Sequence, residues 1–91
     1  MGKLINVGFG NMVNTEKIIA IVSLDSAPVK RMVQKAKEDG TSIDATQGRK
    51  TKSVIVMENN QIVLSALVTE TIVNRFYSDA NGERSMVSDG E

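Results

Sequence analysis

The fold is decided by residues 54–67, VIVMENNQIVLSAL. Two apolar, β-branched runs flank a polar tetrad, and such runs form strands when turn residues separate them. Asparagine tolerates a positive φ, so Asn59 and Asn60 are the expected loop residues of a β-hairpin. With that loop, we expect Met57 to oppose Ile62, and the next pairs to be Val56 with Val63 and Ile55 with Leu64.

Alternation along this hairpin makes both of its faces apolar. The expected members of one face are Ile55, Met57, Ile62 and Leu64, and those of the other are largely Val54, Val56, Val63 and Leu67. One helix does not comfortably cover two faces of a sheet. The sequence therefore requires a second helix from this chain or a second subunit.

A segment rich in positive charge, TQGRKTKS (residues 46–53), comes directly before the hairpin. Its three cations, without an acid or a large apolar side chain, predict an exposed loop. Arg49 can present a planar fork of donors to phosphate or guanine, and Lys50 and Lys52 act as mobile point charges. The neutral donors of this loop are Thr46, Gln47 and Thr51. The loop suits a phosphate-rich partner; the alternative is a solvated loop that only aids solubility.

A helix is predicted from about residue 26 to Asp39. Asp25 or Ser26 can cap its free backbone donors, Pro28 is tolerated in a first turn, and Gly40 ends it. Its buried stripe is expected to be Val29, Met32, Val33 and Ala36. The opposite face is mostly basic, and its secondary binding candidates are Lys30 and Arg31.

The remaining segments predict short elements around this frame. We expect a strand at residues 3–7 with a turn at 8–11, a buried strand at 17–23 and a weak strand at 41–45. A short helix is expected from Thr69, with an apolar face made by Ile72, Val73, Phe76 and Tyr77. The fold class is thus α+β, a small β-rich domain with one central helix and a short C-terminal helix. We expect a single domain over residues 1–78 and a disordered acidic tail over 79–91.

The composition excludes several kinds of chemistry. The 91 residues contain no Cys and no His, which removes disulfides, zinc fingers and the usual general base. No catalytic spacing is recognisable, so an enzyme is not expected, and neither is a cofactor, a metal or a small-molecule substrate. No apolar run resembles a signal peptide or a membrane span, so a cytoplasmic location without membrane contact is expected.

The net charge of zero is a cancellation between the two halves of the chain. Residues 1–53 carry nine Lys or Arg against five acids, a balance of +4, and residues 54–91 carry two against six, a balance of −4. The first half therefore offers a basic surface in spite of the neutral total. The local excess is modest, so a lone monomer is not expected to bind an anionic partner very strongly.

Three motifs stand out along the chain, NVGFGNMV (residues 6–13), DSAPVKR (25–31) and DATQGRKT (44–51). They closely resemble the RemA family of bacterial extracellular-matrix regulatory proteins, over roughly residues 1–77. The resemblance implies a LytTR-like DNA-binding domain that assembles into a ring-like homo-oligomer with DNA around its basic outside. It also implies a transcription regulator, associated with the nucleoid, that activates matrix and biofilm genes.

The family's functional positions fall on specific residues here. Its paired basic positions in the loop fall on Arg49 and Lys50, and its basic position at the start of the second strand falls on Lys17. Familiar members tend to carry arginine where Lys17 and Lys50 stand. Lysine keeps the charge but loses the bidentate fork, so phosphate contact is retained better than guanine readout.

Two classes of function follow. The first is an oligomeric regulator that grips duplex DNA, since repeating the loop around an oligomer multiplies phosphate contacts and raises avidity. The alternative is an RNA-binding or protein-interaction module that uses the same basic surface. Single-strand RNA binders usually stack bases on exposed aromatic side chains, of which this chain has few.

Overall fold

The computed structural model describes residues 3–80. The elements in chain order are β1 (Leu4–Asn6), β2 (Met12–Asn14), the 3₁₀ turn η1 (Thr15–Lys17), β3 (Ile18–Ser23), α1 (Ala27–Asp39), β4 (Ser42–Asp44), β5 (Ser53–Met57), the 3₁₀ turn η2 (Glu58–Asn60), β6 (Ile62–Ser65) and α2 (Thr69–Ala80). This confirms the α+β class, with one central and one C-terminal helix. The strand β2 was not predicted, because its three residues pair only with β1 and no apolar run marks them in the sequence.

Four strands form the main sheet in the order β3-β5-β6-β4, and β1 and β2 form a separate hairpin. β3 is antiparallel to β5, β5 is antiparallel to β6, and β6 is parallel to β4. Thus β3 and β4 run in the same direction at opposite edges of the sheet, and α1 connects them. The β5–β6 hairpin fills the space between them, as a split βαβ arrangement requires.

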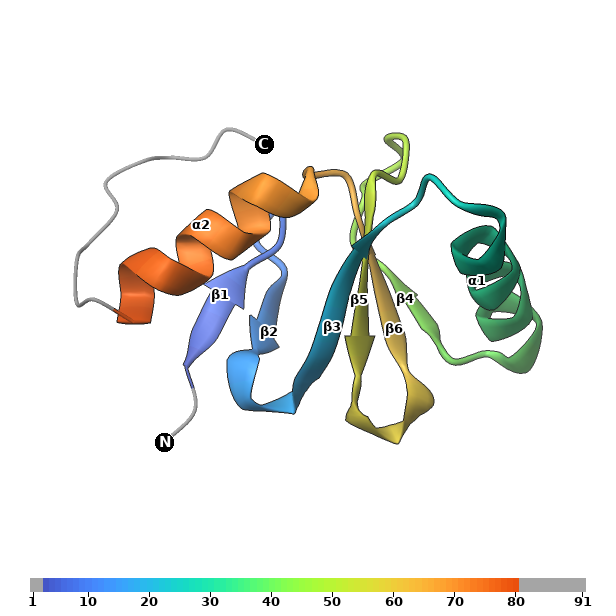
Figure 1. Cartoon of the computed structure of the whole chain (residues 1–91), viewed down its shortest axis with the longest axis horizontal. Coiled ribbons are helices and arrows are strands. Elements are labelled where there is room, and N and C mark those ends of the chain that lie inside the picture. Colours follow the sequence, from blue (N-terminus) through green and yellow to red (C-terminus); the bar gives the residue numbers. More distant parts are fainter. Residues whose placement is uncertain (1–2, 81–91) are drawn as a thin grey trace.

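The molecule has three layers (Figure 1). The main sheet stands in the middle, α1 covers one of its faces, and β1, β2 and α2 cover the other. One core cluster joins α1 to the sheet through Val33, Ala36, Val54, Ile62 and Leu64. The second joins the N-terminal hairpin and α2 to the sheet through Ile5, Val7, Val13, Ala45, Ile55, Val63 and Ile72. The second face is therefore covered from within the chain.

The hairpin prediction is correct in its position and wrong in its register. Val56 pairs with Ile62 and Ile55 with Val63, one residue away from the expected pairing. The cause is a longer connection, in which the Met57 N–H donates to the Gln61 carbonyl and residues 58–60 form a 3₁₀ turn. Both asparagines of the turn do adopt the expected positive φ, 70° and 64°.

The shift in register also changes the two faces. Val54, Val56, Ile62 and Leu64 face α1, whereas Ile55, Met57, Val63 and Leu67 belong to the opposite cluster. The predicted sets had Ile62 and Leu64 exchanged with Val63 and Leu67. A slip of one residue moves every side chain of a strand to the other face, so this error follows directly from the register.

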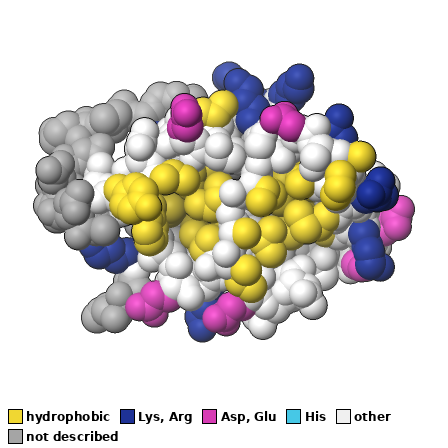
Figure 2. Space-filling model, in the orientation of Figure 1, with side chains coloured by type: hydrophobic (Ala, Val, Ile, Leu, Met, Phe, Trp, Pro, Cys, Tyr) yellow, Lys and Arg dark blue, Asp and Glu magenta, His cyan; other side chains and the backbone are white. Residues whose placement is uncertain are grey.

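The strand at residues 18–23 was expected to be buried, and that prediction was wrong. β3 pairs only with β5 and lies at the sheet edge, none of its residues is buried, and Ile19 is 65% exposed. A β-branched run identifies a strand but does not say how many neighbours it has. Figure 1 places β3 at the front of the sheet, and Figure 2 shows hydrophobic side chains in a band across this face.

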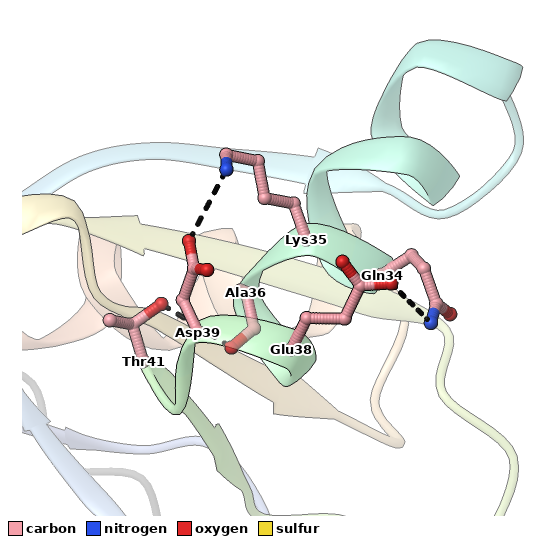
Figure 3. A network of polar contacts seen from close by, with 6 residues as sticks. All are labelled: Gln34, Lys35, Ala36, Glu38, Asp39 and Thr41. Carbon is pink, nitrogen blue, oxygen red and sulfur yellow. Dashed lines mark hydrogen bonds and ion pairs between the residues drawn. The ribbon is translucent and has the colours of Figure 1, made fainter.

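The central helix matches its sequence signals. The Ser26 hydroxyl oxygen accepts the Val29 N–H at 3.4 Å, and Gly40 ends the helix with φ 77°. On the outer face of its last turns, Lys35 pairs with Asp39 at 3.5 Å and Gln34 donates to Glu38 at 3.3 Å (Figure 3). This part of the basic face is thus partly neutralised within the helix itself.

The C-terminal helix is buried over only part of its predicted apolar face. Ile72 is fully buried in the core, but Phe76 is 37% exposed and Tyr77 is 60% exposed. The helix extends to Ala80, so residues 79 and 80 of the predicted tail belong to it. The rest of that tail, residues 81–91, lies outside the described residues.

Candidate nucleic-acid interface

Four segments meet at one end of the main sheet, which we call the loop end. They are the turn at Gly8–Asn11, the loop at residues 45–52, the link at residues 66–68 and the first turn of α1. The Ser65 hydroxyl donates to the Val7 carbonyl at 2.7 Å, and the Leu24 N–H donates to the Lys52 carbonyl at 3.3 Å. We call the opposite end, with η1 and η2, the hairpin end. The loop end and the hairpin end lie at the two ends of strand β5.

Two matching turns shape the loop end. The Arg49 N–H donates to the Thr46 carbonyl at 2.9 Å, and the Asn11 N–H donates to the Gly8 carbonyl at the same distance. The two central residues of each turn have positive φ, 55° and 81° at Gln47 and Gly48, and 53° and 79° at Phe9 and Gly10. This is the φ pattern of type I′ turns, in which glycine removes strain at the second position. The turns place Arg49 and Phe9 next to each other.

The loop is fixed at its start by Asp44 and Thr46. Asp44 Oδ1 accepts the Thr46 hydroxyl at 2.6 Å and the Thr46 N–H at 2.9 Å. These bonds, first the hydroxyl and then the N–H, hold the pKa of Asp44 below its ordinary value, and the charge of Lys37 acts in the same direction. Thr46 itself is only 2% exposed. Its side chain holds the loop in place and is not presented to a partner.

A cleft of about 560 Å³ opens between the two turns and the link that follows β6. Its lining residues are Phe9, Arg49, Lys50, Lys52, Ala66, Leu67 and Val68. The Arg49 guanidinium carbon lies 5.5 Å from the centre of the Phe9 ring, within the range of a cation–π contact. The cleft therefore combines an apolar floor with three positive charges at one side.

Two buried serines support the floor of this cleft. Ser65, at the end of β6, accepts the Leu67 N–H at 3.0 Å while it donates to Val7. Ser53, at the start of β5, donates its hydroxyl to the Leu67 carbonyl. Both serines are fully buried. Because buried hydroxyl groups with satisfied hydrogen bonds restrain their surroundings, the turn at Phe9 and the link at Leu67 are held together.

The cations at the loop end have no acidic partner within residues 3–80. They are Arg49, Lys50 and Lys52 from the loop, and Lys30 and Arg31 from the first turns of α1. Figure 2 shows Lys and Arg side chains along the upper edge of the molecule and down the side where α1 lies. Both helices also begin at this end, so their positive dipole ends add to the field.

Lys17 lies at the hairpin end and is not brought together with the loop cations. Its ammonium group pairs with the Glu58 carboxylate at 3.6 Å, because Ile18 pairs with Met57 and brings η1 beside η2. Within one subunit, Lys17 therefore lies at the opposite end of the sheet from the other predicted site residues. Gln47 and Lys52 are exposed and Thr51 is half-buried, all at the loop end.

Sequence reasoning missed Phe9 and Leu67 as neighbours of the basic loop. The signal for Phe9 was present, because an aromatic residue between two glycines is held in a left-handed turn and displays its ring. Leu67 carries no local signal, since only the register of β6 and the two serines place it there. Within residues 3–80 there is no group of three or more Asp or Glu side chains that could hold a metal ion, nor a helix long and apolar enough to span a membrane.

Comparison with known proteins places this arrangement among bacterial regulatory proteins. Residues 4–76 match the family model "RemA-like: Extracellular matrix regulatory protein A-like". A protein of Lachnoclostridium phytofermentans, named "Putative regulatory protein", is 64% identical over 75 residues, which cover 82% of each chain. A similarly named protein of Desulfosudis oleivorans is 59% identical over 81 residues, covering 89% of this chain and 82% of the relative. The relative in Geobacillus kaustophilus is 52% identical over 77 residues, covering 85% of this chain and 88% of its own.

The chain thus belongs to the RemA-like family.

Proposed function

We propose that this protein is a non-enzymatic regulator that binds duplex DNA as a homo-oligomer. The observation that carries the proposal is the loop end, where Arg49, Lys50 and Lys52 are exposed and unpaired within residues 3–80. Exposed cations held on a rigid turn are suited to phosphate oxygens, which supply most contacts in protein–DNA interfaces. The family is described as extracellular matrix regulatory protein A-like, and we propose that this protein activates extracellular-matrix genes.

The contacts that we assign follow the exposure of each side chain. Arg49, Lys50 and Lys52 grip phosphates, and Gln47 and Thr51 add neutral donors. Lys30 and Arg31 extend the surface along α1. Thr46 does not contact DNA in this assignment; its hydrogen bonds with Asp44 hold the loop in place. We propose that the loop approaches the duplex first, in the LytTR-like mode that the family resemblance implies, with α1 at its side.

Assembly is supported by β3. This edge strand has unpaired backbone groups on its outer side and carries Ile19, which is 65% exposed. A band of hydrophobic side chains crosses the same face (Figure 2). An irregularity between Ile18 and Ala20 interrupts this edge, but it leaves the Ile19 side chain exposed, and an exposed apolar side chain on an edge strand favours a contact with another copy. A ring of such copies would repeat the loop end around its outside and raise the avidity for one duplex.

A single-stranded RNA partner is less well supported. The aromatic side chain at the loop end is Phe9, and the Arg49 guanidinium lies over its ring. A base could stack on Phe9 there only after Arg49 had moved. Within residues 3–80, the five cations of the loop end outnumber its one aromatic ring, Phe9, so we favour duplex DNA over RNA, and binding to both at equal salt separates the two.

The first experiment measures solution mass by light scattering, with and without a promoter-length duplex, together with binding by fluorescence anisotropy. We expect a discrete oligomer and a stoichiometric complex, with log affinity falling by about 0.9 per neutralised phosphate for each unit of log salt. Arg49→Ala should abolish binding and leave the mass unchanged, whereas Lys35→Ala, paired with Asp39 on α1, should bind normally. A monomer that ignores DNA at moderate salt would contradict the proposal.

A second experiment tests the assembly surface. Ile19→Glu places a charge on the exposed β3 edge and should shift the light-scattering mass to that of the monomer. Ile43→Glu is the matched control, since Ile43 is 49% exposed on β4 at the other edge of the same sheet. Equal masses for the two variants and the wild type would exclude β3 from the interface.

A further inference from the structure

The cleft at the loop end has features that a convex duplex does not use. It is concave, it has a volume of about 560 Å³, and Ala66, Leu67 and Val68 give it an apolar side. Phosphates on the outside of a duplex need exposed charge and no apolar floor. Pockets of about 300–1,000 Å³ with an apolar lining and a few convergent polar groups are typical of small-molecule sites.

The Arg49–Phe9 pair lines one side of this cleft. The guanidinium carbon lies 5.5 Å from the ring centre, and hydrogen bonds to the backbone fix the two turns that carry these residues. Arginine guanidinium planes and aromatic rings are both surfaces on which a nucleobase stacks. Lys50 and Lys52 follow in the same loop and also line the cleft, so two ammonium groups belong to the same site.

We propose that this cleft is a binding site for a free nucleotide. The base stacks on the outer face of the Arg49 guanidinium, the sugar contacts Leu67, and a diphosphate is bound by Lys50 and Lys52. Nucleotide and DNA would use the same three cations, so a bound nucleotide excludes DNA from the loop end. Only this competition rests on the proposed function; the binding of the nucleotide does not.

The chemistry favours a nucleotide over a simple anion. Inorganic phosphate or pyrophosphate satisfies Lys50 and Lys52 but leaves the apolar floor and the outer face of Arg49 in water. A nucleoside covers those surfaces but leaves the ammonium groups unpaired. A nucleotide does both, so its affinity should exceed that of either part.

Equilibrium dialysis of the full chain with labelled ADP, pyrophosphate or adenosine, at equal ionic strength, tests this directly. We expect ADP to bind at least tenfold more tightly than either of the other two probes. Equal affinity for pyrophosphate and ADP would reduce the cleft to a simple anion site and overturn the proposal. No saturable binding of ADP would overturn it as well.

The variant Arg49→Lys keeps the charge and removes the plane. We expect it to lower ADP affinity about tenfold and to leave pyrophosphate affinity within twofold. Lys35→Ala is the control, since Lys35 is exposed, pairs with Asp39 on α1 and lies outside the cleft lining. Both positions are exposed, and circular dichroism verifies that each variant is folded. Unchanged ADP binding by Arg49→Lys would overturn the stacking assignment.

A competition assay separates this inference from the proposed function. Adding ADP, but not adenosine, should weaken duplex binding by the factor expected for one shared site. Duplex binding that ADP does not affect would contradict the shared site. Saturable ADP binding by a chain that ignores DNA would instead remove the proposed function and leave the nucleotide site standing.

Discussion

The two ends of the main sheet differ in whether their basic side chains have acidic partners. At the hairpin end, Lys17 is paired with Glu58 at 3.6 Å. At the loop end, Arg49, Lys50 and Lys52 have no acid partner within residues 3–80, and Arg49 lies on an aromatic ring. The difference shows that a count of basic residues does not locate a binding surface. What matters is which cations the fold leaves without a partner.

The largest expected effect comes from removing charge at each end in turn. Arg49→Ala combined with Lys50→Ala removes two charge-assisted contacts per subunit, each contributing about 1.5–3 kcal/mol. The affinity of each subunit should therefore fall roughly 100-fold or more, and duplex binding by the oligomer should be abolished, as expected for Arg49→Ala alone. Lys17→Ala should reduce duplex affinity by less than about threefold in anisotropy titrations at the same salt. Both variants should keep the wild-type mass.

If Lys17→Ala lowered duplex affinity as much as the loop variant, the contrast between the two ends would be wrong. This result would mean that assembly brings Lys17 of one subunit beside the loop of the next, since the two groups lie at opposite ends of a single chain. Glu58→Gln sharpens the test, because it releases Lys17 from its pair without removing the lysine. Tighter DNA binding by Glu58→Gln would support that shared surface.

The backbone conformation of the loop end can be disrupted without a change in its charge. Gly48 has φ 81° and an added Cβ would meet nothing within 4 Å, so any effect of a substitution there comes from the backbone. Gly48→Val should lower the free energy of unfolding by about 1–2 kcal/mol. Urea unfolding at one fixed protein concentration measures it, and Gly48→Asn, which tolerates positive φ, is the milder control. Equal losses for the two variants would contradict the strain argument.

The smallest effect concerns pH. The pKa of Asp44 is lowered in the folded state from the ordinary 3.8, mainly by its bonds with Thr46. Its contribution to stability is therefore complete above about pH 4 and is lost as the pH falls through the lowered pKa. The stability difference between wild type and Asp44→Asn should shrink from pH 6 to pH 3, by a small amount because Asp44 is exposed to solvent. A difference that grows on acidification would contradict the assigned direction.

Local signals in the sequence were sufficient for several elements. Ser26, Pro28 and Gly40 predicted the limits of α1, and Asn59 and Asn60 predicted the tip of the β5–β6 hairpin. Each of these depends on the conformation of one or two residues, which the residue type itself restricts.

Features that depend on distant partners were not predictable in the same way. The register of β5 against β6 depends on a connection of three residues, 58–60, instead of two. The edge position of β3 depends on which strands lie beside it. The loop cations were found from the sequence, but their separation from Lys17 was not, because it follows from the strand order. The contact of Phe9 with Arg49 joins segments 40 residues apart, and no short window contains it.

The strand order also has a consequence for how the chain is made. β3 and β4 form the two edges of the sheet, and the strands between them, β5 and β6, come later in the chain. A nascent chain that ends before residue 53 contains β3, α1 and β4, but it lacks the two central strands with which β3 and β4 pair. The sheet therefore closes only after residue 65 has left the ribosome, and folding depends on contacts between distant segments. A truncation before residue 53 removes both central strands and leaves β3 and β4 without the neighbours they pair with.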